Sequence, residues 1–192
     1  MSSEVIIWKE IILENFEEAK FSQENLKTRL EKETVMADLS LSRNITAPIP
    51  ESRQSLVIRI PKAANYPFAF YFPEPLVLRG FVREIKVPLY SSQSLGNITM
   101  IVEDQYFETK QIMVSSLNFR GWKVCSISFA QVMEQNDRIF QRSANMRILG
   151  FYYLPNEENA KNQEVLIAID DISAVVRDKY RPLRDKGILL EE

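Results

Sequence analysis

Apolar and polar side chains alternate with a period of two along much of the chain. The clearest example is Lys123–Phe129, where Cys125, Ile127 and Phe129 share one face and serines occupy part of the other. Such alternation is typical of half-buried antiparallel strands. Pro88 lies inside another such segment and indicates an edge or a bulge there, because proline has no N–H to donate. Alternation or short apolar runs predict further strands at Val5–Phe16, Ser55–Ile60, Tyr66–Pro75, Arg83–Tyr90, Ile98–Asp104, Gln111–Ser115, Met146–Leu154 and Glu164–Val176.

Turn-forming stretches separate these segments. Residues 91–97 and 155–162, for example, contain the Ser, Asn, Gly and Pro residues that favour turns. Roughly eight short strands with little helix predict an all-β protein, an antiparallel β-sandwich of two sheets. A parallel α/β fold is disfavoured because no helical crossovers separate the strands. We therefore expect one sandwich domain over residues 1–176 and a charged tail over residues 177–192.

The segment Glu17–Leu41 departs from this pattern. It is rich in Glu, Lys, Gln and Asn and contains neither Gly nor Pro. Leu26 and Leu30 lie four positions apart, as on one face of a short amphipathic helix. An ordered loop laid over the sandwich is the alternative. Two prolines, at positions 48 and 50, end the segment, so residues 17–50 are expected to form a polar helical or loop excursion.

The composition argues against several classes of function. The 192 residues include no His and one Cys, which leaves no Ser-His-Asp triad, imidazole zinc site or internal disulfide. Basic and acidic side chains number 24 and 26, a formal charge of −2, whereas nucleic-acid binding needs an excess of Lys and Arg. No apolar run approaches the roughly 18 residues of a membrane-spanning helix. Because no nucleophile–base pair can be named, we expect no enzymatic activity. No cofactor is expected either, apart from the candidate structural calcium ion considered below.

Several short motifs follow one another in a characteristic order. The most specific is LNFRGWK at Leu117–Lys123. The others are ILENFE at Ile12–Glu17, REIKV at Arg83–Val87, VED at Val102–Asp104, ILGFYY at Ile148–Tyr153 and IAIDDI at Ile167–Ile172. In this order and spacing they resemble the FlaA family, the outer-layer or sheath proteins of the spirochaete flagellar filament. The resemblance extends from Ile12 to Val176 and does not include an alignment of Glu17–Leu41.

The resemblance implies a jelly-roll sandwich of the kind shared with carbohydrate-binding modules. Members of the family are exported to the periplasm, where they cover a flagellin core without enzymatic activity. The partners implied are therefore the flagellin core, other sheath proteins and neighbouring copies of the chain. The first residues, MSSE, show no charged region followed by an apolar one, as a signal peptide would. From the residues alone a cytoplasmic protein and a mature exported domain with an added Met both fit, and the periplasmic location follows from the resemblance.

Two functions are expected on these grounds. The first is a structural component of the periplasmic flagellar sheath, which contributes to filament shape, stiffness and motility. The alternative is a carbohydrate-binding module of the same sandwich type. That alternative requires exposed aromatic and polar side chains in a groove or a loop cluster.

A pair of carboxylates follows the strand that ends at Ile169. Asp170 and Asp171 are candidate ligands of a structural calcium ion, with Glu14 or Glu17 from the first strand as partners. The alternative is that one aspartate faces solvent and the other accepts a hydrogen bond from the next turn.

Candidate contact residues are mostly aromatic. Trp122 follows Gly121 and is either an aromatic packed over a turn or an exposed ring that stacks on a sugar or a neighbouring subunit. The cluster at residues 66–72 has more aromatic side chains than one sheet face usually buries, which suggests a share in an interface. The interface candidates are Trp122, Tyr66, Phe70 and Tyr71, with Ile188, Leu189 and Leu190 of the tail.

Overall fold

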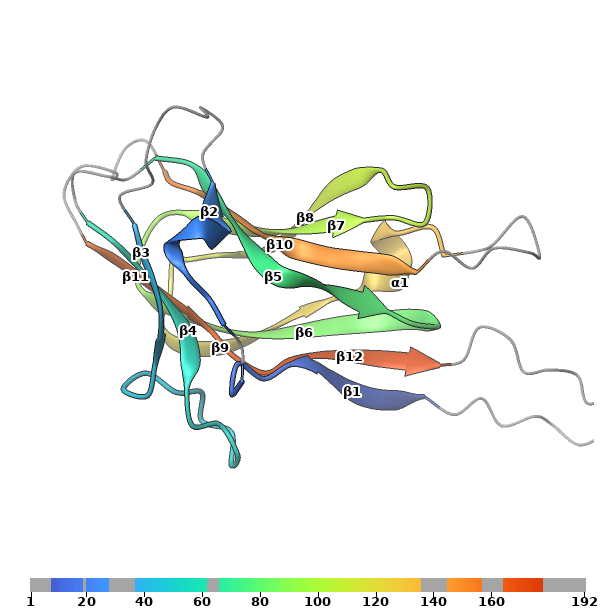
Figure 1. Ribbon diagram of the computed structural model, residues 1–192, viewed down its shortest axis with the longest axis horizontal. Coiled ribbons are helices and arrows are strands. Elements are labelled where there is room, and N and C mark those ends of the chain that lie inside the picture. The colour runs from blue at the N-terminus through green and yellow to red at the C-terminus, as the bar shows by residue number, and fades with distance from the viewer. Residues whose placement is uncertain are drawn as a thin grey trace, which may run out of the picture.

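The computed structural model of the protein describes residues 8–18, 20–27, 37–61, 66–135, 145–156 and 164–177. The strands of these residues form two sheets that pack face to face as the two layers of Figure 1. Every strand pair in both sheets is antiparallel within the described residues. The predicted all-β sandwich is therefore confirmed.

Sheet A, the lower layer of Figure 1, has seven strands in the described part of the chain. Their order is β1-β12-β6-β11-β4-β3, and β9 pairs along the other edge of β6. The strands are β1 (Lys9–Glu14), β3 (Asp38–Ser42), β4 (Ser55–Ile60), β6 (Phe81–Ser92), β9 (Arg120–Ile127), β11 (Val165–Ile169) and β12 (Ile172–Arg177).

Sheet B has five strands among the described residues, in the order β2-β5-β10-β7-β8. They are β2 (Leu26–Lys27), β5 (Phe68–Leu78), β7 (Asn97–Glu103), β8 (Thr109–Ser116) and β10 (Met146–Leu154). Strands β7 and β8 are consecutive in the chain and form an antiparallel hairpin. A 3-10 helix, η1 (Gln23–Asn25), and one helical turn, α1 (Phe129–Val132), complete the described elements.

The core fills the space between the two sheets with the inward-facing side chains of both. Phe70 of β5 stacks on Phe151 of β10 at 5.3 Å between ring centroids, and both are almost fully buried. Cys125 is 4% exposed and belongs to the same core, as the alternation of β9 predicts. Burial raises the pKa of its thiol, as expected for an unreactive apolar side chain.

Strands β11 and β12 continue one another along the same edge of β6. Ile169 pairs with Leu89 and Ser173 pairs with Lys86, while Asp170 and Asp171 lie at the break between the strands. On the far side, β4 pairs with β11 and β1 pairs with β12. The break is thus the point where the neighbouring strand changes from β4 to β1.

Of the two positions predicted for Pro88, an edge or a bulge, the edge is wrong, because β6 is an interior strand of sheet A. Pro88 pairs with Val124 of β9, and its carbonyl accepts a hydrogen bond from the Asp170 N–H at 3.2 Å. Its ring nitrogen therefore faces the break between β11 and β12, where no regular partner strand would use an N–H. The break explains how an interior strand tolerates proline.

The amphipathic helix considered for Glu17–Leu41 is absent from the described residues of that segment. They contain η1, the two-residue β2 and the start of β3. Leu26 belongs to β2 and is 8% exposed, whereas Leu30 lies outside the described residues. Arg177, placed at the start of the predicted tail, is the last residue of β12.

Candidate functional site

The outer face of sheet A, turned away from sheet B, carries a continuous strip of side chains. Directly paired residues of antiparallel strands point to the same face. The pairs Glu10–Val175, Ile12–Ser173 and Ser173–Lys86 therefore align side chains of β1, β12 and β6. The pairs Pro88–Val124 and Tyr90–Trp122 continue the strip along β6 and β9.

The middle of this strip is hollowed into a groove of about 520 Å³, here named the outer groove. Its apolar lining is aliphatic, and Ile12 and Val124 are 65% and 58% exposed. The loop between β3 and β4 forms one wall. The lining residues are Glu10, Ile12, Asn15, Glu17, Ile49, Pro50, Glu51, Lys86, Pro88, Val124, Asp171 and Ser173.

A polar network crosses the floor of the outer groove. Lys86 Nζ lies 2.7 Å from Glu10 Oε2, and the Ser173 hydroxyl donates to Glu10 Oε1 at 2.7 Å. The hydrogen bond from Lys86 is the largest of the effects that lower the pKa of Glu10, and the bond from Ser173 adds to it. These side chains are held in one arrangement, which suits them to orient a ligand with several hydroxyl or amide groups.

Asp170 anchors the wall of the groove and is itself 0% exposed. Its Oδ2 accepts hydrogen bonds from the Ala47 N–H at 3.1 Å and the Ser52 hydroxyl at 2.5 Å, and its Oδ1 accepts one from the Asp171 N–H at 2.9 Å. Burial nevertheless raises the pKa of Asp170. The carboxylate therefore ties the β3–β4 loop to the break between β11 and β12.

The carboxylates predicted as calcium ligands, those of Asp170, Asp171, Glu14 and Glu17, do not converge on one point. Glu17 lies near both aspartates, but its Oε1 accepts from the N–H groups of Arg53 and Gln54. Glu14 accepts from the Phe16 N–H and lines a different hollow. Within the described ranges, no three Asp, Glu, Cys or His side chains are grouped so as to hold a metal ion. Asp170 matches the alternative instead, because its carboxylate accepts a hydrogen bond from the N–H of the next residue.

Asp171 is partly exposed beside the groove and has a left-handed backbone, with φ of 37°. Burial raises its pKa from 3.8 to about 6, and the carboxylates of Asp170, Glu17 and Glu51 add to the rise. The folded state therefore binds this proton more tightly than the unfolded chain does. The contribution of Asp171 to stability falls as the pH rises from about 4 to about 6 and stays low above that.

Asp171→Asn is therefore expected to stabilise the protein at pH 7 by about 1–2 kcal/mol. The gain is this modest because Asp171 is partly exposed and solvent screens its charge. Asn cannot ionise and tolerates a left-handed backbone. Urea unfolding between pH 4 and pH 7.5 measures the effect, and the gain should disappear near pH 4. Asp171→Ala is the control, because it removes the charge but strains the backbone. A gain that is the same at both ends of the pH range contradicts the explanation.

Tyr90 and Trp122 form an aromatic pair one step along the strip from the groove. Their ring centroids lie 5.7 Å apart at an interplanar angle of 63°, an edge-to-face contact. Both side chains are partly exposed. Gly121 precedes Trp122 with φ of 92°, a conformation that favours glycine. Trp122 is thus a partly exposed aromatic that packs against Tyr90, and its role in an interface stays a prediction.

The other interface candidates have different environments. Phe70 is 1% exposed, so its assignment to an interface is wrong and it belongs to the core. Tyr66 and Tyr71 are partly exposed, and Lys27 Nζ lies 5.4 Å from the ring centroid of Tyr71. The remaining candidates lie outside the described residues: Ile188, Leu189 and Leu190.

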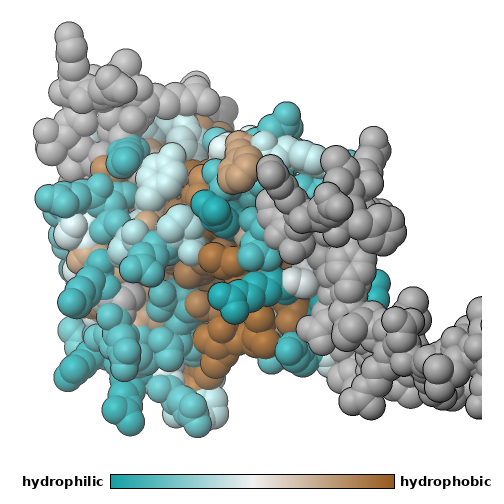
Figure 2. All heavy atoms as spheres, turned by 45° about the vertical axis from the view of Figure 1, so that its right-hand side comes forward, coloured by the Kyte–Doolittle hydropathy of each residue, from teal (hydrophilic) through white to brown (hydrophobic). Residues whose placement is uncertain are grey.

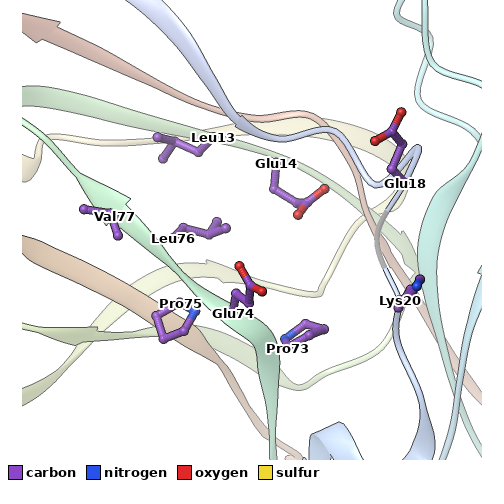
Figure 3. A pocket seen from close by; sticks show the side chains of 9 residues that line it. All are labelled: Leu13, Glu14, Glu18, Lys20, Pro73, Glu74, Pro75, Leu76 and Val77. Atoms are coloured by element: carbon purple, nitrogen blue, oxygen red, sulfur yellow. The ribbon is translucent and has the colours of Figure 1, made fainter.

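A second hollow, of about 560 Å³, lies between β1 and β5 where the edges of the two sheets approach each other. Figure 3 shows Glu14 and Glu74 between these strands with Leu13 and Leu76 beside them. Pro73 and Pro75 of β5 also line it. These prolines remove two N–H donors from this stretch of β5, which disfavours continuous pairing by another strand.

Sequence reasoning missed most of the strip. Tyr90 is an ordinary position in a predicted strand, and Trp8, Arg83 and Arg177 lie far apart in the chain. The fold brings these three residues together, because both arginine side chains contact the Trp8 ring at one end of the strip. The alternation of β6 is the one local signal, because it puts Lys86 and Tyr90 on the same polar side.

No protein-family model and no curated protein matches the sequence. Among solved structures, the fold is similar to a family 11 carbohydrate-binding module of a cellulosomal cellulase of Clostridium thermocellum, with 12% identity and a TM-score of 0.46 over 90% of this chain and 98% of that one. A xylan-binding domain from Paenibacillus barcinonensis has 10% identity and a TM-score of 0.40 over 92% and 99% of the two chains. These similarities are limited to the general path of the chain through a β-sandwich.

Proposed function

We propose that the protein is a non-enzymatic binding module that holds an extended carbohydrate chain along the outer face of sheet A. The observation that carries the proposal is the accessible Tyr90–Trp122 pair in line with the Glu10–Lys86–Ser173 network. A sugar ring presents apolar C–H faces and polar hydroxyl edges, so it needs an aromatic surface and fixed hydrogen-bonding groups together. The strip supplies both on one sheet face.

Calorimetric titration with β-1,4-linked gluco-, xylo- and galacto-oligosaccharides tests this function. Trp122→Ala is expected to weaken binding about tenfold or more, equivalent to about 1.4 kcal/mol, because the aromatic contact area is lost. The control is Tyr106→Ala, since Tyr106 is 55% exposed in the turn between β7 and β8 of the other sheet. Absence of binding by the folded wild-type protein at millimolar glycan would overturn the proposal.

The second candidate is the flagellar sheath component that the sequence resembles. The observation that favours it is the aliphatic lining of the outer groove, where Ile12 and Val124 are exposed and none of the described lining residues is aromatic. Aliphatic grooves of this kind suit protein side chains. Figure 2 shows an apolar patch bordered by hydrophilic side chains on the face that it draws. In this reading the partners are the flagellin core and neighbouring sheath subunits of a periplasmic filament.

Cosedimentation with purified periplasmic flagellar filaments separates the two candidates. If the sheath reading holds, wild-type protein should bind filaments saturably and Ile12→Ser should weaken that binding. Met113→Ser is the matched control, because Met113 is 50% exposed on β8 of sheet B. Saturable glycan binding with no filament binding would reject the sheath candidate.

A further inference from the structure

Two arginines and two aromatic rings form a cluster at the end of the strip opposite Trp122. Arg83 lies 5.1 Å and Arg177 lies 5.4 Å from the ring centroid of Trp8, measured from each Cζ. Arg177 also lies 4.6 Å from the ring of Phe81. We name these four residues the arginine–aromatic cluster. The rings hold the guanidinium groups in place by cation–π contacts.

The guanidinium groups of this cluster lack a carboxylate partner in the part of the chain that the structure describes. The ion pairs formed there join Lys86 to Glu10, Lys110 to Asp104 and Arg147 to Glu103. Arg177 Nε is buried and has no hydrogen-bond acceptor among the described residues. Arg83 is exposed and Arg177 is partly exposed, so an anion from outside the chain can approach these two side chains. Guanidinium groups bind carboxylates and other oxyanions through charge-assisted hydrogen bonds, which suits the cluster to such a ligand.

Charge changes sign along the strip. Beyond the arginine–aromatic cluster come Glu84 and the paired Glu10, and the far side of the outer groove carries Glu17, Glu51 and Asp171. From Arg83 to Tyr90 the strip follows β6 for about 23 Å, at about 3.3 Å per residue. An anion is therefore favoured at the cluster and repelled by the carboxylates of the groove.

We propose that the arginine–aromatic cluster is an anion subsite, and that the ligand is a sparsely charged acidic glycan whose single acid group sits between Arg83 and Arg177 while its neutral units lie toward Trp122. This proposal rests on the carbohydrate-binding function proposed above. It adds a charge requirement at one end of the strip. Densely charged polyanions are excluded because their acid groups would also meet Glu51 and Asp171.

Matched ligand pairs test the charge requirement. Each pair is a gluco-, xylo- or galacto-oligosaccharide with one glucuronic acid branch and the same molecule with that carboxyl reduced to an alcohol. In calorimetry, wild-type protein should bind the acid form about tenfold more tightly in the pair that fits. Arg83→Gln and Arg177→Gln should remove that advantage, and Trp122→Ala should weaken both forms equally. Arg59→Gln is the control, because Arg59 is the exposed residue of β4 in the same sheet, and it should change the affinity for neither form.

The outcomes separate this inference from the function on which it rests. Equal affinity for the acid and neutral forms overturns the anion subsite and leaves the carbohydrate function standing. Binding by neither form overturns the carbohydrate function and the acidic-glycan ligand together. A second measurement needs no sugar: sodium sulfate, compared with sodium chloride at equal ionic strength, should shift the Trp8 indole N–H resonance saturably. Sulfate that leaves this resonance unmoved in the wild type overturns the subsite itself.

Discussion

Gly150→Ala is expected to lower the free energy of unfolding by about 3 kcal/mol, the cost of severe overpacking in a rigid core. A Cβ atom at position 150 would lie 2.1 Å from the carbonyl oxygen of Phe70 and 2.7 Å from Cα of Tyr71. Both are backbone atoms of β5, so no side chain can rotate away. The neighbouring strands of sheet B would have to separate beside the Phe70–Phe151 stack.

Gly121→Ala is the control for this prediction. Gly121 has φ of 92°, so its substitution strains the backbone. A Cβ atom added there would lie within 4 Å of no described residue other than its chain neighbours, so no crowding is added. Its expected cost is only about 1–2 kcal/mol. Urea unfolding of both variants gives the comparison. If Gly150→Ala costs no more than Gly121→Ala, β5 does not approach β10 as closely as described.

Asp170→Ala is expected to destabilise the protein by about 3 kcal/mol, because each buried donor left without an acceptor costs about 1–3 kcal/mol. The N–H groups of Ala47 and Asp171 and the hydroxyl of Ser52 all lose their acceptor. The raised pKa of Asp170 offsets part of the loss, since a buried charge is also removed. Urea unfolding measures the net loss of stability. Faster hydrogen exchange at the Ala47 amide would show that the β3–β4 loop is the part that loosens.

Two variants accompany this measurement. Asp170→Asn keeps one oxygen acceptor and nearly the same volume, so its loss should be smaller than that of alanine. Ser52→Ala removes one donor and leaves the two backbone bonds, with an expected loss of about 1 kcal/mol. Unchanged exchange at Ala47 in Asp170→Ala would show that this carboxylate does not hold the loop.

Alternation is sufficient to predict a strand whose two faces differ in burial, such as β9. It is less informative at β5, which continues through Pro73 and Pro75 because residues 72–75 leave the pairing with β10. Nor does it reveal that Pro88 is interior, because that depends on a break in a strand some 80 residues later. Long-range register is not encoded in local periodicity.

The candidate site shows the same limit. Trp122 is identifiable because a large aromatic follows a glycine in a predicted strand. The arginine–aromatic cluster is not, because Trp8, Arg83 and Arg177 belong to separate segments and no local pattern joins them. Asp170 and Asp171 stand out as adjacent carboxylates, but their roles differ because one is enclosed by the β3–β4 loop and the other is partly exposed.

The pairing of Lys9 with Val176 places the two described ends of the sandwich side by side, at the right of Figure 1. A tensile load applied through Trp8 and Arg177 would therefore meet the β1–β12 hydrogen bonds one at a time. Strands loaded in this way separate by breaking their hydrogen bonds one after another, starting at the loaded end. Strands loaded at opposite ends distribute the force over all their hydrogen bonds at once. In a pulling experiment through these residues, β1 should detach first and at low force, before the rest of the sandwich yields.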